Sequence, residues 1–150
     1  MTFSLVDEIA SGARSESEVW AAALREAPEW EPVFSPLAPE ELALGVETVY
    51  EAYLVHYGRP RLFAAPDADQ AVLLGDYLYA HGLVRIAEAG GVEAVRVLAD
   101  LISRCAALRA DGSTGDGDAW VDAARALGGK PDGDAVARAL ERHSARVALL

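Results

Sequence analysis

Apolar residues recur every three to four positions along most of the chain, and this spacing predicts helices. The longest such region runs from Pro39 to Ala110, interrupted by residues 58–66 and by the pair Gly90-Gly91. The strict alternation of apolar and polar residues that is typical of strands does not extend over any useful length. We therefore predict an all-α, single-domain bundle of about six or seven helices.

Glycine and proline residues mark where the expected helices end. The expected helices cover residues 4–13, 15–27, 39–57, 67–89, 92–110, 118–127 and 134–147. The second begins at Ser15, where Glu18 three residues later completes a capping box. Short glycine breaks between long helices predict antiparallel neighbours in a bundle. We treat residues 1–150 as one domain, with a core at about 39–110 and a C-terminal helical pair at about 118–147.

The connector between the second and third expected helices has an unusual composition. Residues 28–39 contain four prolines together with Trp30 and Phe34. Prolines prevent a regular helix and keep the chain extended, whereas large aromatic rings bury much apolar area. We therefore expect an ordered, extended connector whose aromatic side chains pack onto the helices.

The stretch Ala71–Arg85, with the sequence AVLLGDYLYAHGLVR, is mostly apolar but has Gly75 and Asp76 near its centre. On a helix, Asp76 shares a face with three apolar residues, at spacings of three, four and seven positions. These residues are Leu73, Ala80 and Leu83. Glycine in a helix costs about 1 kcal/mol relative to alanine, so Gly75 indicates a close helix crossing or a bound ligand.

Asp76 is therefore expected to be mostly buried. Burying a polar group without a partner costs roughly 2–7 kcal/mol, and more for a charge, so the carboxylate needs a hydrogen-bond donor. We expect the donor to come from a neighbouring helix and to be His56, Tyr53 or Arg59. Alternatively, Asp76 lies at the rim of a cavity and binds a metal ion or a ligand.

Composition and charge narrow the range of functions. Hydrophobic residues make up 52% of the 150 residues, which fits one domain with a packed core. The net charge of −11 repels phosphate backbones and anionic lipids, so we expect no nucleic-acid binding and no peripheral membrane binding. No apolar run of about 18 residues occurs, so no membrane span is expected. The N-terminal residues do not resemble a secretory signal, and we expect a soluble, cytoplasmic protein.

Residues 71–104, AVLLGDYLYAHGLVRIAEAGGVEAVRVLADLISR, carry the most specific pattern in the chain. They resemble the helix after the first metal site, the Ala-Glu-x-Gly break and the next helix of trans-isoprenyl diphosphate synthases, the polyprenyl synthetase family. The order of elements over residues 39–110, about half of the chain, is similar as well. The resemblance implies a fold like half of the isoprenoid synthase bundle. It also implies pairing through helices of this region.

The residues that perform the family's chemistry are not matched. That chemistry uses aspartate-rich motifs whose carboxylates hold Mg²⁺ on the diphosphate. The helix at the first motif offers only Glu47 and Glu51 in place of Asp-Asp-x-x-Asp, and the second motif has no counterpart. We therefore expect a non-catalytic protein that acts by subunit association. It would be the small subunit of a two-component prenyl synthase, together with a larger synthase subunit, or a homodimer.

Two alternatives stay open at this point. The first is a binding module for a prenyl diphosphate or another ligand with an apolar chain. Its cavity would be lined by Tyr50, Tyr53, Tyr57, Tyr77 and His81, with Arg59 and Arg61 receiving the phosphate groups. The second is a divergent prenyltransferase in which Glu47, Glu51 and Asp76 hold Mg²⁺. No cofactor is expected unless this enzymatic alternative holds.

Simpler interpretations compete with each candidate site. Glu47 and Glu51 fit a solvated helix face, and Arg59 and Arg61 fit surface salt bridges to the many acidic residues. The run DGSTGDGD at 111–118 fits a flexible loop better than a calcium loop, since an aspartate stands where an EF-hand requires glycine. The three histidines, His56, His81 and His143, are too scattered to indicate a metal site. The single cysteine, Cys105, excludes an internal disulfide and fits the core.

Overall fold

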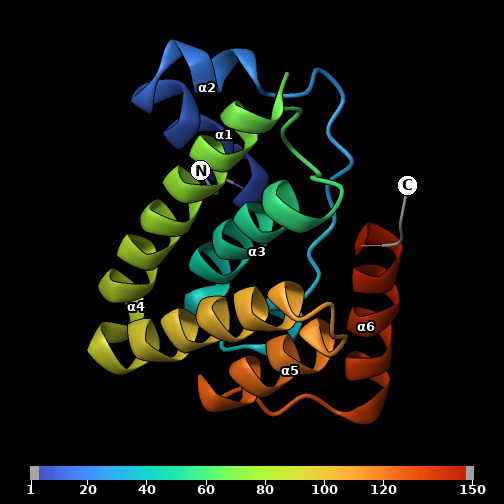
Figure 1. The fold of residues 1–150 in the computed structure, drawn as a ribbon. Coiled ribbons are helices and arrows are strands. Elements are labelled where there is room, and N and C mark those ends of the chain that lie inside the picture. The colour runs from blue at the N-terminus through green and yellow to red at the C-terminus, as the bar shows by residue number, and fades with distance from the viewer. Residues whose placement is uncertain (1–3, 148–150) are drawn as a thin grey trace.

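The computed structural model describes residues 4–147, and all of the regular secondary structure in this part is helical. Its α-helices are α1 (Leu5–Glu16), α2 (Glu18–Ala22), α3 (Ala43–Tyr57), α4 (Ala68–Ala110), α5 (Asp116–Ala126) and α6 (Gly133–Val147), with short 3-10 helices at Ser35–Leu37 and Glu40–Leu42 (Figure 1). Within this part, the only strand-like feature is an isolated bridge between Leu24 and Phe63. The prediction of an all-α, single-domain bundle is confirmed.

Helix α4 is bent sharply at Gly91, which has φ 73° and ψ −167°. Glycine adopts this left-handed region without the strain that a Cβ would cause. The bend separates a first arm, residues 68–90, from a second arm, residues 92–110. The first arm runs beside α3 and the second crosses beneath it, next to α5 (Figure 1). The sequence prediction of two helices divided at Gly90-Gly91 is confirmed.

Helices α3 and α4 approach closely because glycines of α4 face α3. A Cβ on Gly82 would lie 2.7 Å from Cγ2 of Val49 and 3.1 Å from the Val49 backbone nitrogen. A Cβ on Gly75 would overlap the imidazole ring of His56. A close helix crossing therefore explains Gly75, as the sequence indicated, without any ligand.

The prediction that Asp76 is mostly buried is wrong. Its side chain is 65% exposed, and its carboxylate lies 3.7 Å from Nε2 of His56, so the expected neighbour is present but the contact lies at the surface. The face of the first arm that meets the bundle consists of Leu74, Gly75, Leu78, Gly82 and Ile86. The buried face therefore differs from the predicted stripe, which contained Leu73, Asp76, Ala80 and Leu83. The difference arises because small residues, and not only large apolar ones, define where two helices cross.

The expected capping box at Ser15 is also wrong. Helix α1 continues through Ser15 to Glu16, and Ser17 caps the short helix α2, its Oγ accepting a hydrogen bond from the Val19 N–H at 3.0 Å. The helix expected to reach residue 27 ends at Ala22. Beyond it, the chain pairs with the segment after α3 instead of continuing as a helix.

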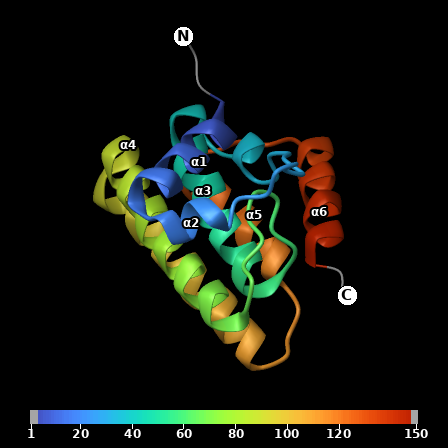
Figure 2. The same cartoon turned by 90° about the horizontal axis from the view of Figure 1, so that it is seen from above.

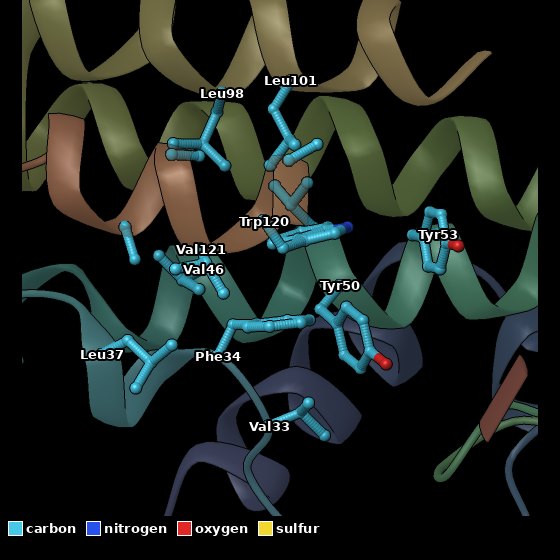
Figure 3. Close-up of a cluster of buried hydrophobic side chains, with 14 of the residues drawn as sticks. Val33, Phe34, Leu37, Val46, Tyr50, Tyr53, Leu98, Leu101, Trp120 and Val121 are labelled. Atoms are coloured by element: carbon cyan, nitrogen blue, oxygen red, sulfur yellow. The ribbon is translucent and has the colours of Figure 1, made fainter. Parts of the chain in front are cut away.

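The main core joins α3, the second arm of α4, α5 and the proline-rich connector. Phe34 is fully buried, stacks on Trp120 with ring centroids 5.3 Å apart, and meets Tyr50 edge to face (Figure 3). The predicted role of the connector as an ordered segment with packed aromatic rings is confirmed. Cys105 lies in the same core, and burial raises the pKa of its thiol to about 12.

A smaller apolar cluster lies where α1 and α2 cover one side of α3 and the first arm of α4 (Figure 2). It is built around Ile9, Ala13, Ala52, Phe63 and Leu74. None of the helices in the described part of the chain has the length and hydropathy needed to cross a membrane.

Candidate functional site

Arg61, Glu47 and Glu51 form an ion cluster with no exposed side-chain surface. Nη1 of Arg61 donates to Oε1 of Glu47 at 2.5 Å, and Nε donates to Oε1 of Glu51 at 2.9 Å. The guanidinium also lies over the rings of Trp30 and Tyr50, 4.2 and 5.0 Å from their centroids. Burial lowers the pKa of Arg61, but the two carboxylates outweigh this effect and the pKa is raised overall. Arg61 therefore stays charged in the interior.

The other oxygens of the two carboxylates are occupied as well. Oε2 of Glu47 accepts hydrogen bonds from the backbone N–H groups of Val33 at 3.0 Å and Ser35 at 2.8 Å. Oε2 of Glu51 accepts from the backbone N–H of Arg61 at 3.0 Å. The interpretation of Glu47 and Glu51 as a solvated face is therefore wrong, and so is that of Arg61 as a surface residue. The cluster therefore links two connecting segments to α3: the proline-rich connector before it, residues 28–39, and the segment after it, residues 58–67.

The three carboxylates considered for Mg²⁺ are not brought together. Glu47 and Glu51 direct all four oxygens to donors of the chain, whereas Asp76 is exposed on α4. Among residues 4–147, no group of three or more His, Cys, Asp or Glu side chains could hold a metal ion. These residues do not fit Mg²⁺, and no catalytic step is assigned to them.

The side chains expected to line a prenyl-chain cavity fall into two groups. Tyr50, Tyr53 and Tyr57 are consecutive neighbours on α3, with ring centroids 5.7 and 5.3 Å apart. Tyr77 and His81 lie together in a different environment, where Tyr77 stacks on Trp20 of α2. Arg59 is 40% exposed and lies 3.8 Å from Glu29, and Arg61 is buried with its charge compensated by Glu47 and Glu51. The structure therefore does not assemble the predicted diphosphate site.

A second buried polar cluster lies where α5 begins. The hydroxyl of Tyr53 donates a short hydrogen bond to Oδ2 of Asp116. Arg109 donates to both groups at 2.8 Å, from Nε to Oδ2 of Asp116 and from Nη2 to the Tyr53 oxygen. Burial raises the pKa of Tyr53, which keeps its hydroxyl a donor. Oδ1 of Asp116 is buried and has no hydrogen-bond partner among the described residues.

His143 of α6 borders this cluster. Its Nδ1 lies 2.8 Å from the hydroxyl of Tyr50, and its ring packs against Phe34. Burial lowers the pKa of His143 from 6.5 to about 4. The imidazole is therefore neutral near pH 7.

His143 should make stability depend on pH in the acidic range. The unfolded chain takes up a proton on this residue near pH 6.5, whereas the folded chain does so only near pH 4, so its contribution is lost as pH falls between these values. The loss is about 3 kcal/mol in the free energy of unfolding. Urea denaturation of wild type and His143→Gln at several pH values measures it. The wild type should lose more stability between pH 6.5 and 4, and parallel pH profiles would contradict this assignment.

A cavity of about 470 Å³ opens beside these groups. It lies between the loop that joins α4 to α5, the first turn of α5, and α6. Its walls include Arg109, Asp116, Asp118, Leu140, His143 and Ser144. This site was not predicted from the sequence, although the polar run at 111–118 supplies one of its walls.

The first arm of α4 lies at the edge of the bundle (Figure 2). It carries exposed apolar residues on its outer side. We call it the α4 outer face and define it by Val72, Leu73, Ala80, Val84 and Ala87. The three large residues are 54–58% exposed. Leu73, Ala80 and Ala87 follow one another at seven-residue intervals. Two acidic residues, Asp69 and Asp76, are exposed along the same face.

Comparison of the chain with protein-family models, with curated proteins and with solved structures found no match.

Proposed function

We propose that this chain is a non-catalytic association protein, the small acidic subunit of an assembly with a larger prenyl synthase. The observation that carries the proposal is the α4 outer face. Exposed apolar residues gathered on one helix face mark a protein–protein interaction surface, and Leu73, Ala80 and Ala87 supply one of the two positions per heptad at which helices pair. The engagement of Glu47 and Glu51 with Arg61 supports a role without metal chemistry.

Charge favours a different chain over a second copy as the partner. The protein carries a net charge of −11, and Asp69 and Asp76 are exposed along the α4 outer face. Two copies paired through this face would bring like charges together, which opposes association. A partner helix with an apolar seam flanked by Lys or Arg would instead meet these acids with opposite charge. We therefore propose a heteromer.

The test is to mix the purified chain with a larger prenyl synthase of the same organism and to measure masses by chromatography with light scattering. We expect the chain alone to be monomeric and the mixture to contain a complex. Val84→Glu should weaken the complex by about tenfold or more, because it places a charge in the apolar seam. Val19→Glu is the matched control, since Val19 is similarly exposed, at 48%, but lies on α2.

Three results would count against the heteromer. No complex, or a complex equally sensitive to both substitutions, would remove the support for the α4 outer face. A dimer of the chain alone that Val84→Glu dissociates would replace the heteromer with a homodimer through the same face.

A further inference from the structure

The bend in α4 depends on the backbone of one residue. Among residues 68–110, Gly91 alone has non-helical angles, and the helix continues on both sides of it. Its φ of 73° and ψ of −167° fall in a region that is essentially open to glycine only. A Cβ on Gly91 would meet no atom within 4 Å. The backbone angles, and not crowding, are therefore what excludes a larger residue here.

The apolar pattern of α4 passes through the bend without a change of register. One heptad position is occupied by Leu73, Ala80, Ala87, Ala94, Leu101 and Leu108. A second position, four residues after the first, is occupied by Tyr77, Val84, Gly91, Leu98 and Cys105. We call these two sets of residues the α4 seam. Two such positions per heptad form a continuous stripe on a straight helix, so the sequence of α4 also suits one straight helix of 43 residues.

The bend gives the two halves of the α4 seam opposite environments. In the first arm, Leu73 and Val84 are exposed, whereas Leu98, Leu101 and Cys105 of the second arm are buried in the main core. The bent helix therefore folds the second half of the seam back onto α3 of its own chain (Figure 1).

Straightening α4 would carry the second arm away from α3 of its own chain. Helices α5 and α6 would move with it, because α5 packs on α4 and α6 packs on α5. A single chain would then lose the burial of its main core, which is unfavourable. A second straight copy offers the same contacts, since its α3 has lost the same segment. Exchange between two copies therefore restores every contact outside the hinge.

We propose that Gly91 is a hinge at which α4 straightens, so that two copies of this chain exchange residues 92–147 and form a domain-swapped dimer. Monomer and dimer share their core contacts, so their balance depends on the hinge and on protein concentration. Segments joined within one chain have an effective concentration in the millimolar range, so wild type at micromolar concentration is the bent monomer. The hinge lies outside the α4 outer face, and the inference does not depend on the association proposed above.

Gly91→Ala tests the hinge. Alanine is strained at a φ of 73° but favours a straight helix more than glycine does, and the dimer relieves this strain at two hinges. The dissociation constant of the swapped dimer should therefore fall by about a thousandfold or more, from the millimolar to the micromolar range. Gly112→Ala is the matched control. Gly112 has a φ of 68° and equally open surroundings, but it lies in the loop between α4 and α5.

The wild type and both variants are refolded from urea, so that segments can exchange, and their masses are measured by chromatography with light scattering. At micromolar concentration we expect a dimer for Gly91→Ala and monomers for Gly112→Ala and wild type. Wild type refolded at millimolar concentration should also contain the dimer. Adding Val84→Glu to Gly91→Ala should leave the dimer intact, because the exchanged contacts do not include the α4 outer face.

A distance between two spin labels on one chain shows whether α4 is straight. The labels are attached to Asp69→Cys and Ser103→Cys, at two exposed positions on the two arms. Cys105 is buried, and burial raises the pKa of its thiol to about 12, so it is not labelled. Dilution with unlabelled chain isolates the distance within one chain. The two positions are about 50 Å apart in a straight helix, and the bent monomer should give a clearly shorter distance.

Four results would overturn the proposal. Gly91→Ala could remain monomeric, its dimer could dissociate with Val84→Glu, the dimer could show the short distance of the bent helix, or Gly112→Ala could dimerise equally. If Gly91→Ala does not fold, wild type refolded at millimolar concentration decides the matter. A wild-type dimer with the long distance supports the hinge, and monomer alone overturns it.

Discussion

Replacing Arg61 with methionine should lower the free energy of unfolding by at least about 3–5 kcal/mol. Removing one partner of a buried ion pair leaves an uncompensated charge in the interior, and Arg61 is the partner of two carboxylates. Domains of this size are stable by about 5–15 kcal/mol, so the variant should lose much of its stability. Chemical denaturation at pH 7, followed by circular dichroism, measures the change.

Arg59→Met is the matched control for this prediction. Arg59 is 40% exposed and lies 3.8 Å from Glu29, and exposed pairs of this kind contribute about 0–1 kcal/mol. Adding Glu47→Gln and Glu51→Gln to Arg61→Met should recover part of the lost stability, since no unpaired charge is then buried. Equal denaturation midpoints for Arg61→Met and Arg59→Met would show that the buried cluster does not stabilise the fold.

Gly129→Ala should be the second most damaging change, with a loss of about 3 kcal/mol in the free energy of unfolding. A Cβ on Gly129 would overlap the carbonyl oxygen of Leu37 and lie 2.9 Å from that of Ala124. Both obstacles are backbone atoms, so the end of α5 and the 3-10 helix at Ser35–Leu37 would have to separate. Thermal unfolding of the variant measures the loss.

Gly133→Ala is the control for the same substitution nearby. A Cβ on Gly133 meets no atom within 4 Å, and this residue begins α6. Alanine is the better helix former by about 1 kcal/mol in a helix interior, so this variant should be as stable as wild type or slightly more so. If the two variants melt at the same temperature, the close packing around Gly129 is not a stabilising feature.

Local signals in the sequence were sufficient to place the helices, but not to show which side of each helix is buried. Glycines and prolines mark helix ends within a few residues, which is why α3, both arms of α4, and α6 were predicted closely. Helix α3 is buried on almost every side from Gly45 to Leu54. Its polar residues therefore share the interior with apolar ones, and periodicity cannot show that Glu47 and Glu51 are buried. Their partner, Arg61, stands beyond the end of the helix.

The polar cluster at α5 depends on contacts that no local pattern reveals. Tyr53 meets Asp116 across 63 positions, and Tyr50 meets His143 across 93. The tyrosines were singled out from the sequence, but Arg109 was not, and Asp116 and His143 were considered only for metal ions. The polar, glycine-rich run at 111–118 was the one sequence signal that this segment could line a functional site.

The buried carboxylates also determine how the connectors exchange their amide hydrogens with solvent. The backbone N–H groups of Val33, Ser35, Arg61 and Leu62 all donate to Glu47 or Glu51. Amides in connecting segments usually exchange through local fluctuations. Here a local opening would leave a buried carboxylate without its donor, so these amides should exchange only when the whole domain unfolds. These four amides lie in connecting segments that contain no α-helix. They would then be as protected from hydrogen exchange as the amides at the centre of α3.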